Sequence, residues 1–222
     1  MANEPKKELT TTEPTDTRFK VLFSSDVIAK RIEELGAAIT KHYKSFPEPI
    51  LVIGVLHGGF IFLADLVRAL FPALNIEVAF VSLSSYANEV TSQGHVTLRS
   101  ELSHNPENRH VLIVDDLIDT GLSLRWLREH LLSKKAASVS VCVCLKKVGD
   151  AAEKGVETKK EETKNEAQTE KETATETATE FVGFMVHGNP FVVGYGMDYA
   201  GLYRGLKHIA VLNRTQHEAL AV

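Results

Sequence analysis

The stretch VLIVDDLIDTGLS, residues 111–123, decides how this chain folds. Its first four residues are all apolar, as in a strand that is buried on both faces of a parallel sheet. Small residues then precede an amphipathic helix, which the spacing predicts over residues 123–132. Small residues let backbone N–H groups converge on an anion, and the helix dipole adds positive potential there. The stretch therefore predicts a strand, a phosphate cradle and a helix, in that order.

Three carboxylates stand in the same stretch. Asp115 and Asp116 end the apolar run, and Asp119 opens the turn that follows. Two adjacent carboxylates at the end of a buried strand are costly unless they are solvated, paired or bound to cations. They suit ribose hydroxyls or a hydrated Mg²⁺ beside a bound phosphate. From the residues alone, a capped helix with exposed aspartates is the alternative.

Strand-like and helix-like segments alternate along the rest of the chain. Continuous apolar runs predict further strands over residues 50–56, 77–83, 139–145, 191–195 and 208–212. Helical spacing predicts one helix that begins at a Ser25-Asp26 cap and another over residues 61–70. This alternation predicts an α/β fold with an open, mostly parallel sheet flanked by helices. In such sheets ligands lie outside the carboxyl ends of the strands.

Polar segments set the expected domain limits. Residues 1–17 predict a disordered tail, and residues 18–222 predict a single domain. A low-complexity insert at 150–180 interrupts this domain with ten acidic residues and five lysines, and it cannot bury enough surface to offset its ordering entropy. A solvated helix is the alternative for the insert. Residues 88–108 have the length of a lid or binding loop, in which residues 95–98 predict a hairpin arm.

Composition excludes several classes of protein. The net charge of −4 belongs to the acidic insert, so the remaining chain is close to neutral and we expect no nucleic-acid partner. No apolar run approaches the roughly 20 residues of a membrane span, and the N-terminal segment lacks the apolar core of a secretory signal. Cys142 and Cys144 alternate along one strand and are expected as reduced core residues. We therefore expect a cytoplasmic protein with no membrane partner.

Four segments together resemble one family. VLIVDDLIDTGLS is similar to the phosphoribosyl-pyrophosphate motif of the type I phosphoribosyltransferases, and more narrowly of the hypoxanthine-guanine (6-oxopurine) enzymes. LHGGFIFLADL (residues 56–66) resembles their pyrophosphate loop, and SSY (residues 84–86) the start of their mobile catalytic loop. FVVGYGMDYAGLYRGLKH (residues 191–208) resembles their purine-binding C-terminal segment. The resemblance runs from about residue 19 to 212, apart from the insert, and implies a small hood formed by the terminal segments.

The resemblance implies a role for each matching residue. Asp119 is expected as the general base at purine N7, with Ser85 and Tyr86 on the catalytic loop that closes over the reaction. Asp115 and Asp116 are expected to bind the ribose hydroxyls and Mg²⁺, and Asp198 to be a further Mg²⁺ ligand. The remaining expected substrate contacts are Thr120, Gly121 and Ser123 for the 5′-phosphate, Leu56, His57, Gly58 and Arg204 for pyrophosphate, Lys146, Phe191 and Val192 for the base, and Ile118.

Lys146 carries the expected choice of base. An ammonium group donates to a 6-oxo oxygen but cannot donate to a 6-amino group, which favours hypoxanthine and guanine over adenine. Lys147 is expected at the surface. The family also has a non-proline cis peptide bond that would fall between Leu56 and His57. His57 stands where the family often has lysine, which changes the charge offered to pyrophosphate. The segment before Phe191 is altered, which leaves acceptance of xanthine open.

The implied function is purine salvage: IMP and GMP would be made from hypoxanthine and guanine with 5-phosphoribosyl 1-pyrophosphate and Mg²⁺, by a homodimer or homotetramer. The alternative is a nucleotide-sensing regulatory protein on the same fold. A regulator that binds nucleic acid would show a basic face, which the scattered lysines and arginines do not predict. A P-loop kinase is set aside because G-x-x-x-x-G-K-[ST] does not occur in the sequence.

Overall fold

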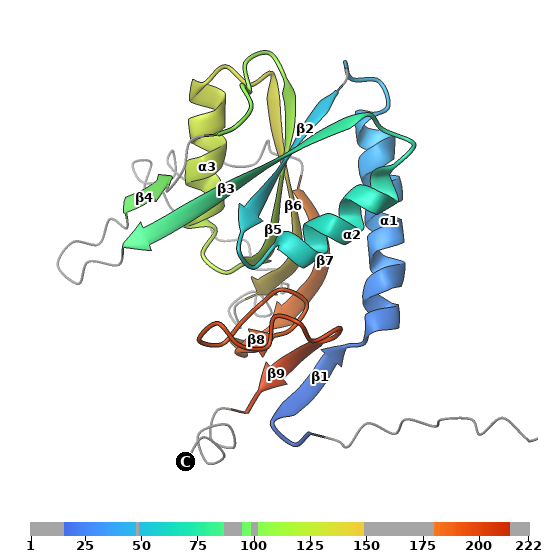
Figure 1. Cartoon of the computed structure of the whole chain (residues 1–222), viewed down its shortest axis with the longest axis vertical. Coiled ribbons are helices and arrows are strands. Elements are labelled where there is room, and N and C mark those ends of the chain that lie inside the picture. Colours follow the sequence, from blue (N-terminus) through green and yellow to red (C-terminus); the bar gives the residue numbers. More distant parts are fainter. Residues whose placement is uncertain (1–15, 48, 87–94, 99–101, 149–179, 214–222) are drawn as a thin grey trace, which may run out of the picture.

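The computed structural model describes residues 16–47, 49–86, 95–98, 102–148 and 180–213. Two sheets and three helices build this part of the chain (Figure 1). The larger sheet has the strand order β4-β3-β2-β5-β6-β7. Its strands are β2 (Ile50–Leu56), β3 (Ile76–Tyr86), β4 (His95–Leu98), β5 (His110–Ile118), β6 (Ser138–Val148) and β7 (Glu180–His187). Five of them run parallel and only β4 is antiparallel, so the predicted open, mostly parallel sheet is confirmed.

Helices cover both faces of this sheet. The helices α1 (Ser25–Tyr43) and α2 (Phe60–Leu70) pack on one face, and α3 (Leu122–Ser133) packs on the other (Figure 1). Strand β2 is buried along its length up to the partly exposed Leu56, because it lies in the middle of the sheet between the two helical layers. Its apolar side chains thus supply both cores, which is why the segment has no polar alternation.

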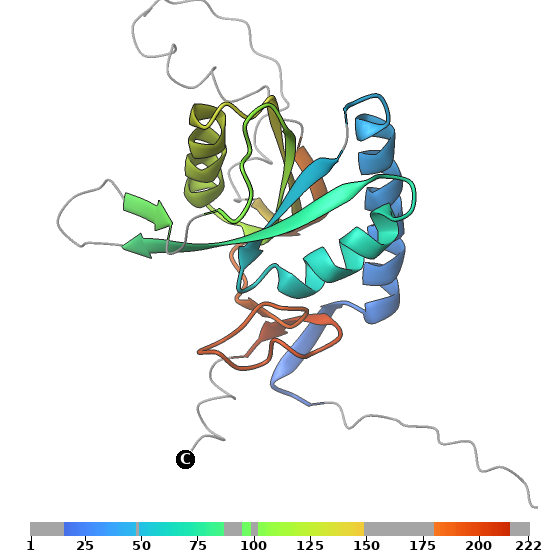
Figure 2. The ribbon, with the colours of Figure 1, turned by 45° about the horizontal axis from the view of Figure 1, so that its top comes forward.

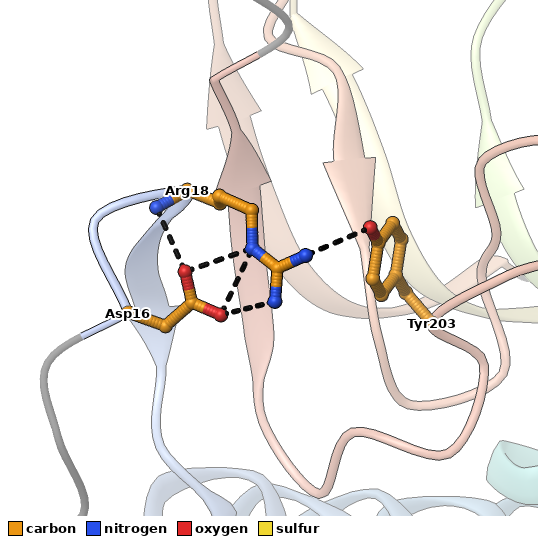
Figure 3. Close-up of polar contacts among 3 residues, drawn as sticks. All are labelled: Asp16, Arg18 and Tyr203. Atoms are coloured by element: carbon orange, nitrogen blue, oxygen red, sulfur yellow. Dashed lines mark hydrogen bonds and ion pairs between the residues drawn. The ribbon is translucent and has the colours of Figure 1, made fainter. Parts of the chain in front are cut away.

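A smaller sheet forms the expected hood at the carboxyl ends of the parallel strands. Strands β1 (Phe19–Phe23), β9 (Ile209–Leu212) and β8 (Val192–Val193) pair antiparallel, so the two ends of the domain meet there (Figure 2). At its rim the Arg18 guanidinium donates to the Asp16 carboxylate and to the Tyr203 hydroxyl (Figure 3). Asp16 lies within the predicted tail of residues 1–17, yet it belongs to the described part of the fold, where it pairs with Arg18 just before β1.

Several predicted boundaries change. The N-cap of α1 is Ser24, whose hydroxyl accepts from the Val27 N–H, rather than the predicted Ser25-Asp26 pair. Glu180 was placed in the acidic insert, yet it begins β7, a strand that the sequence did not predict. Of the strand predicted over residues 191–195, only two residues pair in β8. The hairpin arm predicted at 95–98 is confirmed as β4, and the remainder of the insert, residues 150–179, lies outside the described residues.

Both cysteines are buried and free, in the core cluster beneath α1 and α2, as expected. Burial raises the pKa of each thiol above its ordinary value, so the reduced neutral form is favoured. In the part of the chain that the structure describes, no helix is both long and apolar enough to span a bilayer.

Candidate active site

The acidic pair lies where β5 leaves the core. Asp115 is about nine-tenths buried, and its Oδ1 accepts the Asp116 backbone N–H at 2.9 Å. Burial, and then the neighbouring Asp116 carboxylate, raise the pKa of the Asp115 carboxyl well above its usual range. Asp116 is only partly buried. The two carboxylates therefore differ in environment although they are adjacent in sequence.

The predicted phosphate cradle forms the start of α3. Gly121 is the residue before the helix and adopts φ +72°, a left-handed conformation that favours glycine. Its carbonyl accepts the first helical N–H, from Arg125, at 2.9 Å. Thr120 Oγ1 accepts the Leu122 N–H at 3.5 Å, while Ser123 lies in the first turn. Thr120 is exposed at the positive end of the helix dipole, which is the geometry that binds a phosphate.

The loop of residues 56–59 lies directly against the acidic pair. The Leu56–His57 peptide bond is cis, as the resemblance implied. A Cβ atom on Gly58 would stand 1.8 Å from Asp116 Oδ2, and one on Gly59 would stand 3.2 Å from the Asp115 Cα. A side chain at position 58 would therefore displace the Asp116 carboxylate, and His57 is exposed beside it.

The hood brings a second group of predicted residues to the same loop. A Cβ on Gly196, whose φ is +103°, would stand 2.1 Å from the Gly58 carbonyl oxygen. Arg204 Nη1 donates to the Gly196 carbonyl at 2.7 Å, and Arg204 Nη2 lies 2.8 Å from Asp198 Oδ1. Hence Arg204 and Asp198 meet each other beside the 56–59 loop, although they are more than 130 positions away from it in sequence.

A hydrogen bond fastens this part of the hood to α2. The Tyr195 hydroxyl, which is nearly buried, donates to Asp65 Oδ2 at 2.6 Å. Asp65 also forms an ion pair with Arg68 on the next turn of the helix. Burial and the Asp65 carboxylate raise the pKa of Tyr195, so it remains a neutral donor. Sequence reasoning missed this pair because its members are 130 residues apart.

The predicted base-binding residues lie at the start of the hood. Val192 is buried in β8, and the Phe191 ring meets the Tyr199 ring edge-on, with 5.4 Å between the ring centroids. The partly exposed Ile118 ends β5 close to Gly121. Ser85 and Tyr86 end β3, where their backbones pair with Val96 and His95 of β4. Their side chains lie outside the described residues, as do residues 88–94 and 99–101 of the predicted lid.

Lys146 and Lys147, near the end of β6, each lie where the other was expected. Lys147 Nζ lies 3.3 Å from Asp119 Oδ2 and 2.7 Å from Asn189 Oδ1, and its side chain is only 14% exposed. Lys146 Nζ instead forms an ion pair with Glu180 Oε2 at 2.8 Å. The prediction that Lys147 is the surface residue is therefore wrong, and Lys147 rather than Lys146 reaches Asp119.

The reason is a break in the alternation of β6. Cys142 packs into the core beneath α1 and α2, whereas Val143 packs beneath α3, as alternation requires. Cys144 and Leu145 then both pack beneath α1 and α2. The break moves every later side chain to the opposite face from the one expected by counting. Asn189 was also missed, and it lies near Lys147 because the break directs the Lys147 side chain toward it.

The carboxylates of the site can supply only a few of the ligands of a cation, so most of its ligands would come from water and substrate. Within the described ranges, no three His, Cys, Asp or Glu side chains are close enough to enclose a metal ion. Asp116 nevertheless presents a partly exposed carboxylate against the 56–59 loop. Mg²⁺ commonly binds one or two carboxylates and completes its octahedron with water and substrate phosphates. The residues present are therefore compatible with Mg²⁺ held jointly with a substrate.

Comparisons with known proteins show the family to which the chain belongs. Residues 24–182 match the phosphoribosyl transferase domain family. The hypoxanthine-guanine phosphoribosyltransferase of Bacillus subtilis is 37% identical over 201 residues, which cover 90% of this chain and 96% of the relative. The hypoxanthine phosphoribosyltransferase of Haemophilus influenzae is 36% identical over 190 residues, covering 85% of this chain and 92% of the relative.

Solved structures agree as well. A structure of the Trypanosoma cruzi hypoxanthine phosphoribosyltransferase superposes with a TM-score of 0.73 at 31% identity, covering 94% of this chain and 100% of that one. Another structure of that enzyme, in complex with its product IMP, gives a TM-score of 0.70 at 32% identity, with 88% and 95% covered. We conclude that this chain belongs to the hypoxanthine-guanine phosphoribosyltransferase family and is a phosphoribosyltransferase of purine salvage.

Proposed function

We propose that this enzyme transfers the phosphoribosyl group of 5-phosphoribosyl 1-pyrophosphate to hypoxanthine and guanine, with Mg²⁺, to give IMP or GMP and pyrophosphate. The observation that carries this proposal is the contact of Lys147 with Asp119, 3.3 Å apart at the carboxyl ends of β5 and β6. One group donates a hydrogen bond and the other accepts a proton. A 6-oxopurine offers the matching pair of atoms, the 6-oxo oxygen and N7, on one edge.

The phosphoribosyl group is proposed to lie along the β5–α3 turn. Its 5′-phosphate would accept hydrogen bonds from the N–H groups and hydroxyls around Thr120, Gly121 and Ser123, where the helix dipole is positive. Asp115 and Asp116 would accept hydrogen bonds from the ribose 2′- and 3′-hydroxyls. The pyrophosphate group would lie against the 56–59 loop, within reach of Arg204, whose guanidinium can grip two oxygens at once.

In the transfer step the purine N9 attacks C1′ of the ribose, and the bond from C1′ to the pyrophosphate oxygen breaks. The purine then carries a positive charge, which it loses as its N7 proton passes to the Asp119 carboxylate. Lys147 donates to the 6-oxo oxygen and so holds N7 toward Asp119. Adenine lacks that acceptor, and its 6-amino group would face an ammonium group without a hydrogen bond.

Asp115, Asp116 and Asp198 are the proposed protein ligands of Mg²⁺. Because they do not enclose an ion in the described part of the chain, water and substrate phosphates would complete its coordination. When bound, Mg²⁺ neutralises charge on pyrophosphate and makes it a better leaving group. Arg204 holds Asp198 at 2.8 Å, and the Gly201 N–H donates to the other Asp198 oxygen at 2.7 Å. These two contacts hold the Asp198 carboxylate in one orientation.

We also propose that the enzyme acts in the cytoplasm as a homodimer or homotetramer. One of the similar structures was solved to examine how a C-terminal region affects the oligomeric state of the Trypanosoma cruzi enzyme, which supports an oligomer. Large apolar side chains of this chain, such as Phe80 and Phe60, are more than 40% exposed and would gain from being covered. Sedimentation of the purified protein tests the assembly.

The two lysines provide the sharpest test of the proposed base contact. Lys147→Ala should raise the KM for hypoxanthine by about tenfold or more, because a hydrogen bond from a charged group is lost. Lys146→Ala is the matched control and should stay within about twofold of the wild type, since Lys146 binds Glu180 instead. Steady-state kinetics with hypoxanthine, guanine, xanthine and adenine would measure both. If Lys146→Ala had the larger effect, the proposed orientation of the base would be wrong.

A further inference from the structure

We infer that Asn189 is a positioning residue for base recognition: it holds the Lys147 ammonium group so that one N–H is directed at the 6-oxo oxygen. This inference rests on the proposed function, because it concerns how the base is bound. The observation behind it is that Asn189 Oδ1 lies 2.7 Å from Lys147 Nζ, closer than the Asp119 carboxylate at 3.3 Å.

The ammonium group has three N–H donors. In the structure one faces Asn189 and another faces Asp119, while the side chain as a whole is 14% exposed. Two fixed acceptors set the rotation of a tetrahedral group, so the direction of the remaining N–H is fixed as well. A lysine held only by Asp119 could turn about that single contact, and a flexible four-carbon side chain loses entropy when substrate then orders it.

The backbone around Asn189 is suited to hold a side chain in place. Lys147 pairs with Val186 in the β6–β7 ladder, so Asn189 follows only three positions later at the same edge of the sheet. Gly188 on one side has φ +72°, in the left-handed region. Pro190 on the other side has its own φ locked and restricts Asn189 to extended conformations. The short connection between β7 and Phe191 therefore restricts the backbone that carries the Asn189 amide.

The chemistry of the amide matters as much as its place. An asparagine carbonyl accepts a hydrogen bond without adding negative charge. Lys147 consequently keeps Asp119 as its one negatively charged neighbour among the contacts that the structure describes. The pair stays close to neutral overall, which suits an uncharged purine, and the Asp119 carboxylate stays available to accept the N7 proton. Loss of Asn189 would release the ammonium group toward Asp119, which weakens base binding.

The test is a double-mutant cycle between Asn189 and Lys147 in the full-length enzyme. Asn189→Ala should raise the KM for hypoxanthine by about tenfold, with kcat and the KM for 5-phosphoribosyl 1-pyrophosphate within about twofold. In the Lys147→Ala background the same substitution should change the KM for hypoxanthine by less than about twofold, because the residue through which it acts is gone. Asn189→Asp keeps a hydrogen-bond acceptor but adds a second negative charge beside the ammonium group, so it should recover only part of the lost KM.

Asn105→Ala is the matched control, because that exposed side chain also accepts one hydrogen bond, from the Glu107 N–H, but far from the site. Equal effects of Asn189→Ala with and without Lys147, or no effect in the wild-type background, would overturn the inference. A parallel rise in the KM for both substrates would instead show a structural role. The wild-type enzyme distinguishes failure of the proposed function from failure of this inference. If the wild type converts no purine base, the proposed function is wrong. If the wild type is active but the two substitutions have additive effects, only the role of Asn189 is wrong.

Discussion

At the scale of single residues, the site contains a carboxyl group, that of Asp115, whose ionised form is destabilised in the folded protein. Asp115 is about nine-tenths buried beside another carboxylate, and its pKa is raised well above the ordinary value, first by burial and then by Asp116. Taking a charge out of water next to a like charge costs free energy unless a cation or a hydrogen-bonding ligand is present. Such local cost is common where binding sites are prepared for a charged ligand.

Asp115→Asn should therefore make the enzyme without substrate more stable and less active. The amide has nearly the same shape but carries no buried charge, so Tm should rise by a few degrees at neutral pH. Turnover should fall, because the ribose hydroxyls and Mg²⁺ lose a negatively charged partner. Differential scanning calorimetry and steady-state rates measure the two effects. A fall in Tm together with normal turnover would show that Asp115 is a structural residue only.

The positions of the site residues were predictable from sequence where a motif fixes the neighbours, and less so where a strand departs from regular alternation. Asp115, Asp116, Asp119 and Gly121 lie within seven consecutive residues, and the structure keeps them together at the end of β5. Lys147 and Lys146 differ by one position, and the break at Cys144 and Leu145 exchanges their faces. Nothing in the apolar pattern of β6 marks that break, since all its neighbours are buried.

At the scale of elements, the connection from β6 to β7 must run back along the length of the parallel ladder that the two strands form. Val148 pairs with His187 at the end of β7, whereas Glu180 at its start pairs with Val141. The chain therefore leaves at one end of the ladder and re-enters about seven residues back, roughly 23 Å at the rise of a strand. The predicted insert contains this return path, so it cannot be removed completely even though its composition is low in complexity.

Replacing residues 149–179 with a linker of about 12 glycines and serines should leave activity within about twofold, because that length reaches the required span. Joining Val148 directly to Glu180 should prevent β7 from pairing and abolish soluble folding. Far-ultraviolet circular dichroism and turnover of both variants provide the comparison. If the linker variant were folded but inactive, the native segment would take part in catalysis.

At the scale of the whole molecule, the site and a cluster of aromatic and histidine rings occupy opposite ends of the parallel strands. His110 begins β5, its Nδ1 lies 2.7 Å from Ser138 Oγ, and its ring packs edge-on against Phe46 at 4.4 Å between centroids. Burial, and then the nearby His42, lower the pKa of His110. This end of the sheet lacks the predicted substrate residues, so changes there should affect stability more than turnover.

Acidification should weaken the fold through His110. Because its pKa is lower in the folded state than in the unfolded chain, the unfolded state binds more protons as the pH falls through about 6.5. The free energy of unfolding therefore decreases below that pH and is regained above it. His110→Phe keeps a ring against Phe46 but cannot be protonated, so its Tm should fall less than that of the wild type between pH 7.5 and 5.5. An identical loss of Tm in both proteins would exclude His110 as the cause.

The parallel sheet could be predicted because each of its central strands is a continuous apolar run next to a helix. The hood could not be predicted in the same detail. Its strands β1, β8 and β9 are two to five residues long and pair across almost the whole length of the chain. Such pairing is decided by tertiary contacts, including those of Arg18 with Tyr203, rather than by local pattern (Figure 3).

The most direct test of the account is the initial rate of IMP formation from hypoxanthine and 5-phosphoribosyl 1-pyrophosphate with Mg²⁺, for the wild type and for Asp119→Asn. We expect Mg²⁺-dependent product from the wild type and a kcat lower by about a hundredfold or more in the variant, with binding of 5-phosphoribosyl 1-pyrophosphate unchanged. Near-normal turnover by Asp119→Asn would remove the proposed base from the mechanism. No product from the wild type with any purine would contradict the central claim and favour a regulatory protein on this fold.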